Sequence, residues 1–83
     1  MKLAKYVKFR QEKFGGVLFE TRSEKVFTLN ATATAVVREI GDGATQADIL
    51  ARLKDRFNDA DGAIEREASA FISELRDKGL LED

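Results

Sequence analysis

The feature that most constrains the fold is a change of hydrophobic periodicity near residue 30 of the 83-residue chain. Before this point, apolar residues alternate with polar ones or form short runs rich in β-branched and aromatic residues. After it, they recur every three to four positions. The first pattern is typical of strands and the second of amphipathic helices. The sequence therefore predicts a sheet followed by helices, an α+β arrangement.

Three segments of the first part have the composition of strands, and short polar or glycine-containing breaks separate them. They are residues 6–10 (YVKFR), 17–19 (VLF) and 25–29 (KVFTL). Gly15 and Gly16 precede the second segment and favour a tight turn or bulge there, because glycine tolerates positive φ. The short connections predict a three-stranded antiparallel meander.

Three segments of the second part are predicted to be helices, at about residues 31–40, 46–57 and 63–78. Asn30 is a favourable N-cap for the first helix, and Thr45 followed by Asp48 resembles a capping box for the second. Residues 58–62 predict a turn, and Gly79 is a natural stop for the third helix. Three strands followed by three helices also match a winged helix-turn-helix-like build.

Length and composition predict a single domain spanning residues 1–83. The absence of cysteine excludes disulfides and thiolate metal sites, and the absence of histidine removes the usual near-neutral general base. Residues 57–68 resemble a calcium loop, but Phe57 and Ala68 occupy its two end-ligand positions. We therefore expect a protein that is not an enzyme and has no cofactor or metal site.

The sequence contains no apolar run near the ~18 residues that a membrane-spanning helix needs. Its N-terminal stretch, MKLAKYVKF, also lacks the apolar region of a signal peptide. We expect a cytoplasmic protein that does not associate with membranes.

Charge is unevenly distributed, with +4 over residues 1–25 and −5 over residues 26–83. This asymmetry favours a protein partner over a polyanion, although chance asymmetry on a solvated surface is an equal alternative. A winged-helix DNA-binding regulator is the second hypothesis for function. Neither the second nor the third predicted helix has the clean basic face that DNA recognition requires, so we expect no nucleic-acid partner.

The predicted sheet has apolar residues on both faces. Val17, Leu18 and Phe19 are apolar at consecutive positions, whereas a sheet with one face in water normally alternates. Either neighbouring strands shield the second face, or another polypeptide covers it or its edge. If residues 25–29 form an edge strand, their free backbone groups are a template for pairing with a peptide.

The chain resembles the PqqD-like family of peptide chaperones, also called precursor-peptide recognition elements. The resemblance lies in residues 6–10 (YVKFR), Glu12, residues 14–19 (FGGVLF), 26–33 (VFTLNATA) and 41–45 (GDGAT), and in Phe71, Leu75 and residues 79–81 (GLL). It implies a winged-helix-like fold that binds the leader of a ribosomally synthesised precursor peptide as an added strand. It also implies delivery of that leader to a modifying enzyme, often a radical S-adenosylmethionine (SAM) protein.

The resemblance places the peptide-binding groove between the third strand and the third helix. On the strand it implies Lys25, Val26, Phe27, Thr28 and Leu29. On the helix we expect a stripe beside the core, made of Ser69, Ile72, Ser73 and Arg76. The small serines would leave room for a peptide and Arg76 would pair with a leader carboxylate. The alternative for these four residues is an ordinary exposed helix flank.

One departure from the family concerns the turn before the third strand. Members that act in pyrroloquinoline quinone (PQQ) biosynthesis commonly carry a Pro-Glu-Gly-like turn there. This chain has Arg22-Ser23-Glu24 and no proline. A different modified peptide is therefore at least as strong an expectation as the quinone precursor.

Overall fold

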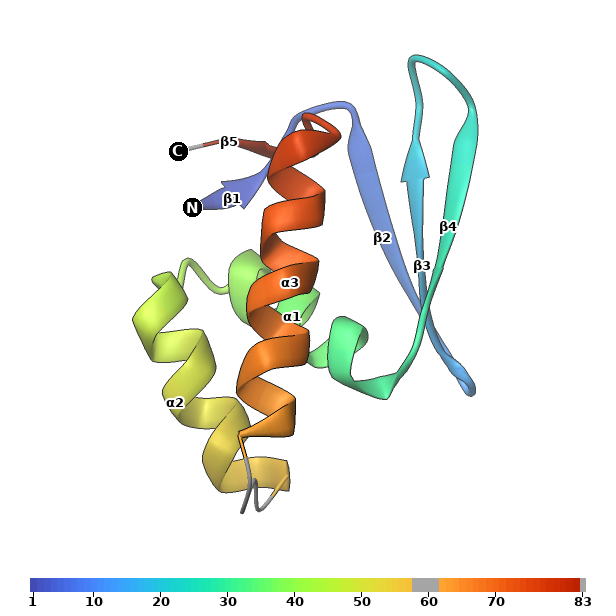
Figure 1. Cartoon of the computed structure of the whole chain (residues 1–83). Helices are drawn as coiled ribbons and strands as arrows, with labels where there is room; N and C mark the ends of the chain where they lie inside the picture. Colours follow the sequence, from blue (N-terminus) through green and yellow to red (C-terminus); the bar gives the residue numbers. More distant parts are fainter. Residues whose placement is uncertain (58–61, 83) are drawn as a thin grey trace.

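The computed structural model describes residues 1–57 and 62–82, and its main elements follow the predicted order (Figure 1). The strands are β1 (Lys2–Leu3), β2 (Val7–Glu12), β3 (Gly15–Glu20), β4 (Lys25–Leu29) and β5 (Leu81–Glu82). The helices are α1 (Ala31–Gly41), α2 (Gln46–Phe57) and α3 (Ala63–Asp77). The antiparallel sheet β2-β3-β4 followed by three helices confirms the predicted α+β class. Of the turn predicted over residues 58–62, residues 58–61 lie outside the described part of the chain.

The entry to β3 depends on glycine. Gly15 has a φ of +147°, a conformation that residues with a side chain rarely adopt. A Cβ at this position would also overlap the carbonyl oxygen of Leu29, at the end of β4. Glycine therefore allows β3 to start beside the end of β4, two residues earlier than the predicted start at Val17.

Both predicted helix caps are confirmed. The backbone N–H of Ala33 donates to Asn30 Oδ1 at 2.8 Å, at the start of α1. At the start of α2, the Asp48 N–H donates to Thr45 Oγ1 at 3.1 Å, and the Thr45 N–H donates to Asp48 Oδ2 at 3.4 Å. This reciprocal pair is a capping box, which satisfies backbone donors that have no partner within the helix.

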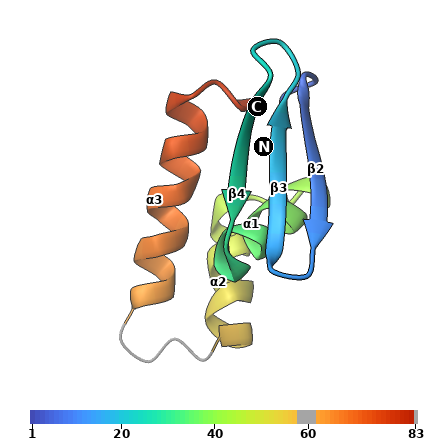
Figure 2. The same ribbon diagram turned by 90° about the vertical axis from the view of Figure 1, so that its right-hand side faces the viewer.

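The core lies between one face of the sheet and the helices. Helix α1 packs on the sheet and also against α2 and α3, so it is the central element of the helical layer. Figure 2 shows α3 standing beside the β4 edge of the sheet. The largest fully buried side chains, from β3, the three helices and the C-terminal segment, are Leu18, Val36, Val37, Ile40, Ile49, Leu53, Ile72 and Leu80.

A second, two-stranded ladder joins the ends of the chain and was not predicted. Lys2 pairs with Glu82 and Leu3 pairs with Leu81, so β1 and β5 run antiparallel (Figure 1). The Ala4 N–H extends this contact by donating to the carbonyl oxygen of Leu80 at 2.9 Å. Two-residue strands that are distant in sequence have no periodicity of their own, which explains why the sequence pattern missed them.

The end of α3 fixes the segment that follows it. The Leu80 N–H donates to the Leu75 carbonyl oxygen at 2.9 Å, and the Gly79 N–H donates to that of Arg76 at 3.0 Å. Gly79 has a φ of +72°, so these two bonds form a Schellman motif, as the predicted glycine stop implied. The motif turns Leu80 inward, where its side chain is buried in the core.

Candidate functional site

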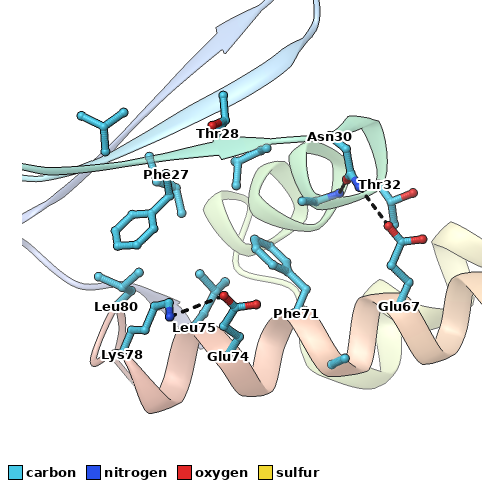
Figure 3. Close-up of a pocket in the computed structure, with 15 residues that line it drawn as sticks. Phe27, Thr28, Asn30, Thr32, Glu67, Phe71, Glu74, Leu75, Lys78 and Leu80 are labelled. Atoms are coloured by element: carbon cyan, nitrogen blue, oxygen red, sulfur yellow. Dashed lines mark hydrogen bonds and ion pairs between the residues drawn. The ribbon is translucent and has the colours of Figure 1, made fainter.

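A hollow with a volume of about 580 Å³ lies between β4 and α3 (Figure 3). Strand β4 and the start of α1 line one side, and α3 with the segment after it lines the other. The lining residues are Leu18, Val26, Phe27, Thr28, Leu29, Asn30, Thr32, Ala33, Glu67, Ala70, Phe71, Glu74, Leu75, Lys78 and Leu80. We call this hollow the β4–α3 groove.

Strand β4 is an edge strand. The order of the sheet is β2-β3-β4, and among the described residues β4 pairs only with β3. Alternate residues of such a strand leave their N–H and C=O groups on the open side, toward the groove. The site therefore offers a row of backbone donors and acceptors next to a hollow.

The floor of the groove is apolar. Leu18, Leu29, Leu75 and Leu80 are buried beneath it. The rings of Phe27, from β4, and Phe71, from α3, point into the space between the two elements (Figure 3). Both phenylalanines are only half-buried. An apolar side chain inserted between these rings would gain burial without first displacing part of the core.

Polar side chains form the rim of the groove, and they are paired across or along it. At the Asn30 end of β4, Asn30 Nδ2 donates to Glu67 Oε1 at 3.1 Å, which links the strand side to α3. At the other end, Lys78 Nζ lies 3.5 Å from Glu74 Oε1 and 5.9 Å from the centre of the Phe27 ring. These exposed contacts are weak individually, so an incoming chain can replace them at low cost.

The structure brings together most of the predicted strand residues but not the predicted helix stripe. Val26, Phe27, Thr28 and Leu29 line the groove. Lys25 is exposed at the start of β4 and is not among the lining residues. In the register of the sheet it lies on the same face as Phe27.

None of the four predicted α3 residues lines the groove. Ile72 is fully buried in the core, and Ser69 is half-buried. Ser73 and Arg76 are exposed, and Arg76 Nη1 donates to Gln46 Oε1 of α2 at 3.3 Å, away from β4. The predicted stripe faces the core and α2 because α3 must bury Ala68, Ile72 and Leu75 against its helical neighbours.

The helix residues that do line the groove were not predicted. They are Glu67, Ala70, Phe71, Glu74, Leu75 and Lys78, which follow one another at helical spacing. The sequence signal for this face was Phe71, a large apolar residue beside the stripe that fills the core. Its half-buried ring marks where the apolar surface of α3 extends past the core toward β4.

The described residues contain no group of three or more His, Cys, Asp or Glu side chains that could hold a metal ion. In residues 1–57 and 62–82, no helix has the length and apolar character needed to span a membrane.

Comparison with known proteins agrees with the fold. The profile of a family described as "Coenzyme PQQ synthesis protein D (PqqD)" matches residues 15–81. No curated protein sequence matches the chain.

Two solved structures superpose on almost the whole chain. "Lasso peptide synthetase B1 complexed with the leader peptide" is 27% identical, with a TM-score of 0.82, over 99% of this chain and 96% of that one. "TbiB1 in Complex with the TbiA(beta) Leader Peptide" is 22% identical, with a TM-score of 0.86, over 99% and 95%. At this identity the second similarity concerns the fold alone.

Proposed function

Because this chain belongs to the PqqD family, we propose that it is a peptide-recognition protein for ribosomally synthesised precursor peptides. It binds the leader of the precursor as an added strand beside β4 and presents it to a modifying enzyme. The recognition domain comprises residues 1–83. The chain itself is not catalytic, and it acts in the cytoplasm, where precursor peptides are synthesised.

The observation that carries this proposal is the combination of an open strand edge with an apolar groove beside it. The backbone of β4 supplies hydrogen bonds that any extended peptide can form, and the groove supplies selectivity through side chains. Peptide capture at a sheet edge needs both parts. The 27% identical structure is a complex with a leader peptide, which supports leader recognition by this chain.

The partner enzyme is a peptide-modifying enzyme, and a radical SAM protein is our first choice because many family members serve such enzymes. The peptide need not be the quinone precursor, since the turn before β4 departs from the pattern of those members. A DNA-binding role has no comparable support.

An amide-shift titration of the ¹⁵N-labelled protein tests the proposal. The probe is a synthetic peptide that copies the leader of a short precursor encoded next to the gene for this chain. We expect shifts along residues 25–29 and on the groove face of α3, at Glu67, Phe71 and Glu74. A 20-base-pair DNA duplex serves as the comparison, and we expect it to leave these amides unchanged. Saturable shifts with DNA at low salt, and none with the leader, would contradict the proposal.

A further inference from the structure

The face of the sheet turned away from the helices has an apolar patch that extends beyond the β4–α3 groove. Val26 is 61% exposed and Phe19 is 37% exposed, which is unusual for large apolar side chains on a sheet that already has a core. A second hollow, of about 490 Å³, lies on this side. Its lining residues are Lys8, Phe9, Arg10, Glu12, Val17, Phe19 and Val26.

The register of the sheet arranges these side chains in rows that cross the strands. Lys8 of β2 is opposite Phe19 of β3, and Phe19 is opposite Val26 of β4. Side chains directly opposite each other share a face and contact each other, so this row ends at the open edge with Val26. A strand added beside β4 would continue the row and place one of its own side chains against Val26.

Val26 also lies between the two hollows, because it lines both the β4–α3 groove and the outer hollow. An added strand therefore borders both hollows at once. Since successive side chains of a strand point to opposite faces, one residue enters the groove between Phe27 and Phe71 while its neighbour meets Val26.

On the basis of the proposed function, we propose that the leader is recognised on both faces of its added strand. The residue that continues the outer row is apolar, and Val26 is the side chain of this protein that selects for it. The bound segment then carries two consecutive apolar residues in place of a strict alternation. Strand β3 has the same two-sided apolar character, because its consecutive residues Leu18 and Phe19 lie on opposite faces of the sheet.

Selection from a displayed library of random 12-residue peptides tests this inference without knowledge of the natural leader. Wild-type protein is expected to enrich peptides with two adjacent apolar residues, and those peptides are expected to shift the amides of β4 and α3. A Val26→Thr variant keeps the β-branched shape and replaces one of the two methyl groups with a polar hydroxyl. This variant is expected to enrich peptides that keep the groove-facing apolar residue but carry apolar and polar residues equally often at the neighbouring position.

A matched pair of enriched peptides, differing only by Val or Thr at the outer position, gives the size of the effect. Wild type should prefer the Val peptide by up to about fivefold in Kd, the range expected for one cross-strand pair, and Val26→Thr should lose this preference. Phe14→Thr is the control, because Phe14 is 60% exposed but lines neither hollow. It should select the same peptides as wild type.

The outcomes separate this inference from the proposed function. If wild type and Val26→Thr enrich the same peptides, and these peptides bind along β4, recognition is one-sided and the inference is overturned while the function stands. If enriched peptides shift only the amide signals of the outer face of the sheet and leave those of α3 unchanged, the outer hollow is a separate site. This result also overturns the inference. If no enriched peptide shifts the amide signals of β4, both the inference and the proposed function are contradicted.

Discussion

Phe27 is the residue where the strand edge, the groove and the rim of charged side chains meet. It lines the groove from β4, and the Lys78 ammonium lies 5.9 Å from its ring. Its neighbours on the strand, Val26 and Thr28, are exposed, whereas Phe27 is half-buried. A side chain in this position can be replaced with less damage to the core than one that is fully buried.

Phe27→Asp is expected to weaken leader binding at least tenfold. The variant removes an apolar contact worth about 1.5–3 kcal/mol when buried, and it introduces a charge that the groove would have to desolvate. Fluorescence anisotropy with a labelled leader measures the change. Phe14→Asp is the matched control, since it makes the same substitution at an exposed site outside the groove. Wild-type affinity in a folded Phe27→Asp protein would show that the groove is not the binding site.

The carboxylate of Glu20, near the turn between β3 and β4, gives the stability of the protein a pH dependence. The hydrogen bond from the Ser23 hydroxyl lowers the pKa of Glu20 most. The Arg22 N–H, which donates to Glu20 Oε1 at 2.8 Å, also lowers this pKa, and partial burial opposes both. Because the folded pKa is lowered, the ionised carboxylate stabilises the fold above the ordinary glutamate pKa of ~4.3. This stabilisation is lost as the pH falls through the lowered value.

Glu20→Gln is therefore expected to lower the melting temperature at pH 7 and to flatten its decline below about pH 4.3. Thermal melting followed by circular dichroism between pH 7 and pH 3 measures both effects. Glu24→Gln removes an exposed carboxylate from the same turn and should leave the profile close to wild type. If the melting temperatures of Glu20→Gln and wild type fall in parallel as the pH is lowered, this role for Glu20 is refuted.

At the level of the elements, the sequence was sufficient wherever a local signal existed. Alternation and short runs rich in β-branched and aromatic residues identified three strands, helical spacing identified three helices, and Asn30 and Thr45 marked two helix starts. The rotation of α3 was not predictable in the same way. It depends on which stripe of the helix meets α1 and α2, and the stripe chosen from the sequence included Ile72, which those contacts bury completely.

The capping box of α2 gives a prediction at this scale. Thr45→Ala removes the hydroxyl that accepts from the Asp48 N–H and is expected to cost about 1 kcal/mol in the free energy of unfolding. Urea denaturation measures this loss. Thr45→Ser keeps the hydroxyl and should remain within a few tenths of a kcal/mol of wild type. An equal loss in both variants would mean that the methyl group, and not the cap, stabilises this end of α2.

For the whole molecule, contacts between residues distant in sequence complete the site. The β1–β5 ladder holds the two ends of the chain together, and the Schellman motif after α3 turns Leu80 into the floor of the groove. The ladder has no local sequence signature, whereas Gly79 marked the Schellman motif in the sequence. The open edge of β4 could be hypothesised from the two-sided apolarity of the strands. Its position opposite α3 was implied by the family resemblance, and the residues of α3 that line the groove required the complete fold.

The central claim is that a peptide joins the sheet as a new strand beside β4. Nuclear Overhauser effects between the backbone of β4 and an isotope-labelled leader peptide, measured together with amide exchange, test it most directly. We expect regularly spaced backbone contacts along Lys25–Leu29 and slowed exchange at alternate amides of this strand when the leader is bound. A leader that binds tightly but leaves the β4 amides exchanging as in the free protein, with no backbone contacts to this strand, would contradict the claim.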